Sequence, residues 1–448
     1  MNPISFFEQS KLKPFHILLV FWLFFILMFD GYDVVIYGAT IPFLKESWGI
    51  SDLIAGSIGS YTTIGTAAGA VFFGLYSDRF GRKNIIILTT LMFSLFTMLS
   101  GFAPNAVFFI ICRVIAGFGF GGVMPNIASL ISEYAPLKYR AAIISFIFCG
   151  YSVGAMGASF IGRALLTDFG WQPVYWIGGI ALLFIPFMLK AIPESLDYLL
   201  THKRHDRIAI IVNKIQPGAA STLDFTYKKV VKAQKSPVKA LFTKKFAVTT
   251  MMFWLACFCT FILMYSLNTW LPTLMLQAGY TLSSSLMFVA VLQIGSIVGT
   301  VILGNVIQKV GFKNVLIPLY LVGAISLILI GFSTNIYLAY FFIFLIGAAT
   351  VGLQNMSNAF VAAYYPVDVR SAALGSTMAF GRIGSIVAPT YVAVLLTMNL
   401  QPQFNFIAIG IAAVFGMIAL FFVNDKHADY QQSAHESETT NTETAQAL

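Results

Sequence analysis

The chain has 448 residues, of which 58% are hydrophobic and only 10% are charged. An ordinary soluble domain carries about 25% charged residues, so this composition excludes a soluble fold. The formal net charge of +9 would suit a nucleic-acid partner, but the basic residues are spread among apolar runs, and we expect no nucleic acid to bind.

Twelve apolar stretches are long enough to cross the hydrocarbon core of a membrane, which takes about 20 helical residues. No small-residue cleavage site follows the first stretch, so we expect it to remain in the lipid bilayer as a span. The stretches run approximately over residues 15–41, 53–76, 84–103, 106–131, 141–165, 172–190, 246–270, 284–308, 314–333, 336–360, 371–395 and 404–424.

The spans form two sets of six, which predicts an all-α membrane protein built from two pseudo-symmetric six-helix halves. The predicted parts are a cytoplasmic N-terminus (1–14), an N-terminal half (15–190), a basic cytoplasmic central loop (191–245), a C-terminal half (246–424) and an acidic, disordered cytoplasmic tail (425–448). If the N-terminus is cytoplasmic, most of the 27 Lys and Arg lie in inner segments, and the outer loops hold only Lys45. The positive-inside rule therefore predicts that both termini are cytoplasmic, in a cytoplasmic (inner) membrane.

An internal repeat supports the two halves. The run Gly74-Leu-Tyr-Ser-Asp-Arg-Phe-Gly-Arg-Lys83 recurs weakly as Gly304-Asn-Val-Ile-Gln-Lys-Val-Gly-Phe-Lys313, at an offset of 230 residues. At the same offset, residues 133–140 match residues 363–370. Two motifs that share one offset indicate parallel repeats.

The first run resembles the most diagnostic motif of the major facilitator superfamily, and its copy lies between spans 8 and 9, where that superfamily has one. Span 4 adds Arg113-x-x-x-Gly117-x-Gly119, which is similar to a second superfamily motif. The resemblance covers about residues 15–424 and implies the major facilitator fold with an alternating-access mechanism. It implies a conformational latch made by Gly74, Asp78, Arg79, Gly81, Arg82 and Lys83.

The chemistry of the latch residues agrees with this reading. Gly74 would let two helices approach closely, and Gly81 would permit a tight turn. Asp78 would accept hydrogen bonds from neighbouring arginines and from a helix amino terminus. The alternative is that Arg79, Arg82 and Lys83 only set the topology, which would not require Asp78 or the glycines.

A narrower resemblance begins in span 1 with Asp30-Gly31-Tyr32-Asp33 and continues with Arg113, the run 119–126, and Pro193-Glu194-Ser195. Together these elements look like the aromatic acid:proton symporter family. The resemblance implies proton-driven import of a small aromatic carboxylate. The runner-up is a transporter of another organic anion, such as muconate, or of a sugar-like solute.

Four charged side chains fall well inside the spans, where each costs at least about 2.5 kcal/mol unless it pairs or faces water. Asp30 and Asp33 are the candidates for proton coupling. Counting about 1.5 Å per helical residue puts Asp30 and Arg113 at similar depth, so we expect those two to interact. Arg113 and Arg382 are the candidates for binding the substrate carboxylate. The alternatives are a structural kink at the aspartates and helix-packing roles for the arginines.

Further binding candidates at similar depth are Tyr61, Tyr151, Gln293 and Phe380, although any single aromatic residue is more often ordinary helix packing. A cytoplasmic gate is suggested by Glu133, Arg140 and Arg370, with Glu133 expected to pair with Arg140 or with the basic loop. The four cysteines lack the spacing of a metal site, and we expect no metal and no cofactor. A polytopic membrane enzyme would need a catalytic constellation that we do not find, and a transporter-like receptor would need a long folded extension. We expect the chain to work as a monomer.

Overall fold

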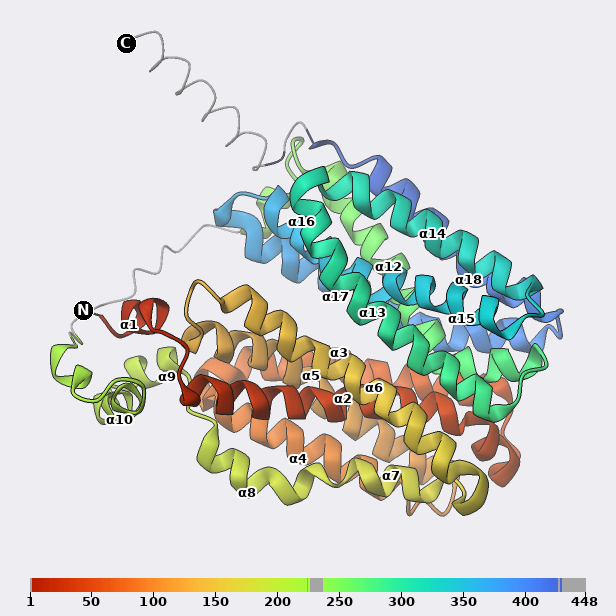
Figure 1. Ribbon diagram of the computed structural model, residues 1–448, viewed down its shortest axis with the longest axis horizontal. Helices are drawn as coiled ribbons and strands as arrows, with labels where there is room; N and C mark the ends of the chain where they lie inside the picture. Colours follow the sequence, from red (N-terminus) through yellow and green to blue (C-terminus); the bar gives the residue numbers. More distant parts are fainter. Residues whose placement is uncertain (1, 224, 226–236, 426–427, 429–448) are drawn as a thin grey trace, which may run out of the picture. The chain divides into compact units, whose positions relative to one another are not determined.

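The computed structural model describes residues 2–223, 225, 237–425 and 428 (Figure 1). In this part of the chain every regular element is a helix. The helices are α1 (Pro3–Gln9), α2 (Pro14–Trp48), α3 (Asp52–Phe80), α4 (Arg82–Ser100), α5 (Ala106–Tyr134), α6 (Arg140–Phe169), α7 (Gln172–Gly178), α8 (Ala181–Ala191), α9 (Leu196–Thr201), α10 (His205–Ile215), η1 (Ala219–Thr222), α11 (Pro237–Leu241), α12 (Ala247–Gln277), α13 (Leu282–Val310), α14 (Phe312–Phe332), α15 (Ile336–Gly347), η2 (Ala348–Gly352), α16 (Leu353–Tyr364), α17 (Val367–Thr397) and α18 (Pro402–Phe421).

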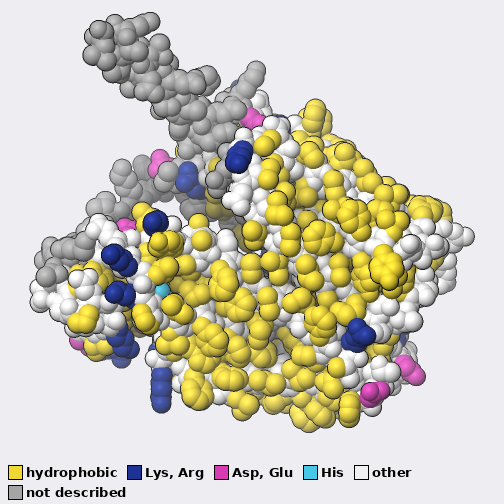
Figure 2. Space-filling view, viewed as in Figure 1, with side chains coloured by type: hydrophobic (Ala, Val, Ile, Leu, Met, Phe, Trp, Pro, Cys, Tyr) yellow, Lys and Arg dark blue, Asp and Glu magenta, His cyan; other side chains and the backbone are white. Residues whose placement is uncertain are grey.

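Twelve helical stretches within the described residues are long and apolar enough to cross a membrane, six between Pro14 and Ala191 and six between Ala247 and Phe421. This confirms the predicted number of spans and the all-α membrane fold. The sixth span combines α7 with α8, and the tenth combines α15, η2 and α16. Figure 2 shows hydrophobic side chains spread over the visible face of the spans, as a lipid-facing surface requires.

The chain divides into two compact units. The N-terminal unit comprises Met1–Val230 with Thr281–Ala290, and the C-terminal unit comprises Val231–Tyr280 with Val291–Leu448. The repeat offset of 230 residues relates helix limits in the two halves: α3 (Asp52–Phe80) corresponds to α13 (Leu282–Val310). It also relates the one-residue turns at Gly81 and Gly311, whose φ angles of 88° and 91° favour glycine.

Small residues set the helix spacing within each unit. A Cβ atom at Gly69 of α3 would lie 1.9 Å from the carbonyl oxygen of Phe118 in α5. At Gly295, a Cβ atom would lie 2.0 Å from the carbonyl oxygen of Phe344 in α15. Backbones therefore touch directly, which is how membrane helices gain packing energy without a hydrophobic driving force.

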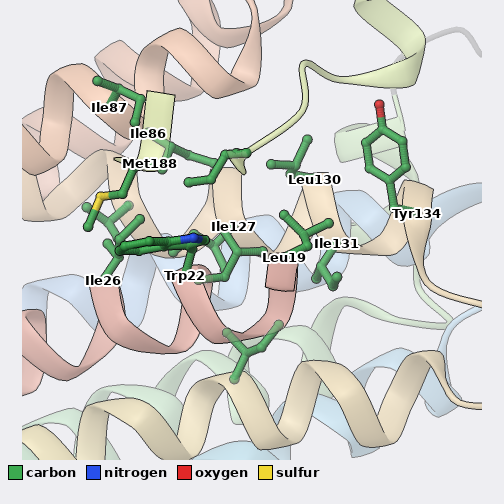
Figure 3. Close-up of a cluster of buried hydrophobic side chains, with 14 of the residues drawn as sticks. Leu19, Trp22, Ile26, Ile86, Ile87, Ile127, Leu130, Ile131, Tyr134 and Met188 are labelled. Carbon is green, nitrogen blue, oxygen red and sulfur yellow. The ribbon is translucent and has the colours of Figure 1, made fainter. Parts of the chain in front are cut away.

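The predicted central loop contains folded structure. On α10, Ile208, Val212 and Ile215 recur at helical spacing, and all three are buried in the hydrophobic core of the N-terminal unit. That core includes Trp22, Leu130 and Met188 from three different spans (Figure 3). Residues 224 and 226–236 of the predicted loop, and the predicted acidic tail apart from Asp425 and Ala428, lie outside the described residues.

Candidate functional site

Both aspartates of the span 1 element are buried within an uninterrupted helix, α2. Asp30 is 4% exposed and Asp33 is 1% exposed. Gly31 between them faces α6, where a Cβ atom would lie 1.8 Å from the carbonyl oxygen of Tyr151. The glycine thus lets α6 pack directly against the turn of α2 that carries the two carboxylates.

The arginine of span 4 pairs with Asp33. Nη1 of Arg113 donates to Oδ1 of Asp33 at 2.7 Å, and each side chain is 2% exposed. Thr97 of α4 donates its hydroxyl to the same oxygen at 2.6 Å, and the Tyr37 ring centroid lies 5.6 Å from the Arg113 guanidinium carbon. The other carboxylate oxygen, Oδ2 of Asp33, has no hydrogen-bond partner among the described residues. One buried carboxylate therefore ties α4 and α5 to α2.

We expected an interaction between Arg113 and Asp30, and the ion pair that the structure shows is the one with Asp33. The two aspartates are one turn apart, and counting residues along a helix does not resolve one turn. Thr97 and Tyr37 were missed, because an apolar span gives no sequence signal for the face on which a lone hydroxyl lies.

The other arginine predicted to bind the substrate lies partly buried in the C-terminal unit. Nη1 of Arg382 on α17 donates to the Tyr265 hydroxyl of α12 at 3.2 Å, and the Arg382 guanidinium carbon lies 5.7 Å from the Phe261 ring centroid. The Phe261 and Tyr265 rings stack at 5.9 Å. Among the described residues no carboxylate lies within 4.0 Å of Arg382. This cation in a span therefore contacts aromatic rings and has no acidic partner in the described part of the chain.

The remaining predicted binding residues are scattered. Phe380 stacks on Trp254 with ring centroids 5.1 Å apart. Gln293 is fully buried and donates to Asn268 at 2.8 Å. Tyr61 is 47% exposed on the apolar outer face of α3, so it takes no part in the Asp33–Arg113 pair. Tyr151 contributes the backbone against which Gly31 packs.

The predicted gate residue Glu133 does not pair with Arg140, but it does bind the predicted central loop. Arg82 of α4 donates to its Oε1 atom, and the Ser195 hydroxyl and the Leu196 amide donate to Oε2 at 2.9 Å and 2.6 Å. Arg140 instead pairs with Glu8 at 3.2 Å. The physical reason is that Arg82 and Ser195 reach the end of α5, whereas α1 occupies the position beside Arg140. Glu133 therefore joins α4, α5 and α9.

The contacts of the latch residues agree with the prediction only in part. The Asp78 side chain is 81% exposed and, as expected of a neighbouring arginine, Arg82 donates to it at 3.5 Å. The helix amino terminus that we expected Asp78 to bind is held by Glu194, whose Oε1 accepts from the Lys83 amide at 3.0 Å. A Cβ atom at Gly74 would meet no described heavy atom within 4 Å, so the expected close helix approach is absent there. The tight turn predicted at Gly81 is present.

The last two predicted residues make local contacts. Arg79 lies over the neighbouring Phe80 ring at 5.8 Å. The Arg370 side chain donates to the Tyr365 carbonyl at 3.3 Å. Glu194 and Ser195 had been noted only as part of a family resemblance, and their hydrogen bonds to α4 and Glu133 could not be read from the sequence.

Two six-span repeats with charged side chains inside the spans define a membrane transporter of the major facilitator fold. The chain belongs to the Major Facilitator Superfamily, whose family model matches residues 23–389 and 287–447, and its relatives place it in the aromatic acid transporter family. It is 37% identical to the benzoate transport protein of Acinetobacter baylyi over 100% of this chain and 99% of the relative. It is 33% identical to the gentisate transporter of Corynebacterium glutamicum, covering 88% and 85% of the two chains.

A solved structure agrees on the fold. The xylose transporter XylE from E. coli, in a partially occluded inward-open conformation, matches with a TM-score of 0.71 at 18% identity. The match covers 92% of this chain and 100% of that chain. Because the chain belongs to the Major Facilitator Superfamily, and to its aromatic acid transporter family, it is a transporter and not an enzyme.

Proposed function

We propose that the protein is a proton-coupled symporter that imports a small aromatic carboxylate across the cytoplasmic membrane, with both termini in the cytoplasm. The observation that carries the proposal is Arg382, a cation within a span with no carboxylate partner among the described residues. An uncompensated charge in a span is costly, and an anionic substrate supplies the missing charge. The two relatives described above are both named for aromatic carboxylates.

The surroundings of Arg382 favour an aromatic acid over other anions. A guanidinium can hold a carboxylate through two parallel hydrogen bonds. Phe261 and Tyr265, which already contact Arg382, offer flat apolar surfaces for a ring. Aromatic rings gain additional energy from such stacked or edge-on contacts.

Proton coupling is assigned to Asp33. Its Oδ1 atom already accepts from Arg113 and Thr97, whereas Oδ2 accepts from no described residue and is the oxygen on which a proton would reside. Protonation removes the negative charge that holds Arg113, so the ion pair that ties α5 to α2 is weakened. Asp30, one turn away, is the second candidate for the same role.

Energetics require such a proton. The inside-negative potential opposes entry of each negative charge by about 2.3 kcal/mol per 100 mV. One proton carried with one monocarboxylate makes the cycle electrically neutral. Both the substrate and the proton are then released in the cytoplasm when the access of the site alternates.

The test is uptake of labelled benzoate and hydroxybenzoates into proteoliposomes that contain the purified protein, with and without an acidic exterior. We expect accumulation above the external concentration only with the pH gradient, and its loss on adding a protonophore. Accumulation that does not depend on the pH gradient would contradict proton coupling. Uptake of muconate or xylose without uptake of any aromatic acid would favour the runner-up function.

A further inference from the structure

The C-terminal unit contains a buried pair of amides, Asn268 and Gln293, in which one carbonyl oxygen has no hydrogen-bond partner among the described residues. Nδ2 of Asn268 donates to the carbonyl of Met264, one turn earlier on α12, at 2.8 Å. The Asn268 side chain is thereby oriented with Oδ1 as its free acceptor. That oxygen accepts from Nε2 of Gln293 on α13 at 2.8 Å.

This chain of bonds fixes the orientation of the Gln293 amide. Because Asn268 offers Gln293 an acceptor, Gln293 must turn its NH2 group toward Asn268 and its carbonyl oxygen away. Gln293 is 0% exposed, and its Oε1 atom has no hydrogen-bond partner among the described residues. A buried carbonyl oxygen without a donor is destabilising, so a donor from outside the chain would be bound there.

Helix α12 links the amide pair to the arginine that carries the proposed function. Asn268 follows Tyr265 by three residues on α12, so the two side chains share a face and lie about 4.5 Å apart along the helix axis. Tyr265 binds Arg382. The positions of Tyr265 and Asn268 are therefore about one helical turn apart. An aromatic acid whose carboxylate is held by Arg382 has a comparable length.

We propose that Gln293, oriented by Asn268, is a specificity-determining residue that accepts a hydrogen bond from a hydroxyl group on the aromatic ring of the substrate. This inference rests on the proposed function, since it assumes that an aromatic acid occupies the position beside Arg382. A neutral carbonyl oxygen accepts a hydrogen bond from a hydroxyl group and forms none with an unsubstituted ring edge. The preferred substrates are accordingly hydroxylated aromatic carboxylates.

The experiment replaces the acceptor with a side chain of similar length and no amide, Gln293→Met, in the full-length protein in proteoliposomes. Competition against labelled substrate is measured for benzoate, its 2-, 3- and 4-hydroxy derivatives and 4-methoxybenzoate. We expect at least one hydroxybenzoate to lose about tenfold in apparent affinity relative to benzoate, because a site built to bind a hydroxyl discriminates strongly. Asn268→Leu, which frees the Gln293 amide, is expected to lower the same selectivity.

Benzoate uptake serves as the internal control for folding and for the proposed function. If the wild-type protein transports no aromatic acid, the proposed function fails. If Gln293→Met weakens benzoate and hydroxybenzoates equally, the amide is structural or binds water, and the inference is overturned. If the variant fails to insert into the membrane, the affinities of the wild-type protein test the inference instead. Equal affinities for 4-hydroxybenzoate, 4-methoxybenzoate and benzoate, together with no higher affinity for the 2- and 3-hydroxy derivatives, would overturn it.

Discussion

Asp33 and Arg113 form an ion pair that joins α2 to α5 with almost no solvent contact, and a single carboxylate oxygen makes the bond. Removing one charge from such a buried pair costs about 3–5 kcal/mol, because the other charge is left uncompensated. The pair is therefore both a structural link and a group whose charge state the protein can exploit.

The first prediction follows from this pair. Asp33→Asn keeps the shape of the side chain but holds it permanently neutral, as protonation would. We expect accumulation driven by a pH gradient to be abolished, while exchange of labelled for unlabelled substrate persists, since exchange needs the binding site but no proton turnover. Both are measured in the same proteoliposomes.

The matched control is Asp52→Asn, which neutralises the carboxylate of the partly exposed ion pair with Lys45 at 2.6 Å. Surface pairs contribute about 0–1 kcal/mol, so this variant should transport normally. If Asp33→Asn still concentrates substrate and Asp30→Asn does not, the coupling role passes to Asp30.

A second prediction concerns the geometry of carboxylate binding. Arg382→Lys keeps the positive charge but loses the planar fork that holds a carboxylate bidentately. We expect the apparent affinity for the aromatic acid to fall about tenfold, the equivalent of about 1.4 kcal/mol, with the protein still inserted. Arg113→Lys should be more damaging, since it also disturbs the Asp33 pair. Unchanged affinity and maximal rate in Arg382→Lys would remove that arginine from the site.

The third prediction is that Gly31 cannot bear a side chain. Alanine would place its Cβ 1.8 Å from the Tyr151 carbonyl oxygen, so α2 and α6 must separate at the turn that carries Asp30 and Asp33. Gly31→Ala should therefore abolish transport and lower thermal stability in detergent. Gly157→Ala on α6 is the control, because a Cβ there meets nothing within 4 Å. Equal behaviour of the two variants would contradict the packing argument.

Much of this architecture is predictable from the sequence, and the site is predictable only in part. The length of each span can be read from its run of apolar residues. The matching turns at Gly81 and Gly311 can be read from the repeated glycine. The partner of Arg113 depends on how each helix is rotated about its axis. Spans that are apolar on every face carry little information about that rotation, so Asp30 and Asp33 could not be told apart.

The same limit explains Glu133. Its position at the end of span 4 was evident, but its partners Arg82 and Ser195 come from segments 51 and 62 residues away in the chain. Which of several nearby basic residues reaches a carboxylate depends on loop geometry. That geometry includes α1 and α9, two short helices that the apolar pattern did not reveal.

A fourth prediction separates stability from transport at Asp78. Its side chain is 81% exposed and makes one ion-pair contact at 3.5 Å, so Asp78→Asn should leave membrane abundance and thermal stability unchanged. We nevertheless expect a severe loss of uptake, because a latch would bind Asp78 in another conformation of the cycle. Glu133→Gln, which weakens three hydrogen-bonding contacts, should reduce abundance as well. Normal uptake by Asp78→Asn would show that the motif only sets the topology.

The last prediction uses the repeat itself. Tyr134 donates its hydroxyl to the carbonyl of Glu194, and 230 residues further on Tyr364 donates to the carbonyl of Asn424 at 2.7 Å. Each tyrosine thus ties the end of the fourth span of its half to the segment that follows the sixth. Tyr134→Phe removes the bond to Glu194, and Tyr364→Phe removes the bond to Asn424 together with a 3.2 Å contact to the Thr249 hydroxyl. Each change should lower the free energy of unfolding by about 1 kcal/mol.

The two tyrosines belong to different units and share no hydrogen-bond partner among the described residues, so their effects should add in the double variant. Thermal unfolding of the purified protein in detergent measures all three variants. Tyr139→Phe, at a partly exposed position, is the control for loss of a hydroxyl without loss of a tie. If the double variant loses much more or much less stability than the sum of the two single variants, the two hydrogen bonds are coupled. The prediction that they act independently would then be wrong.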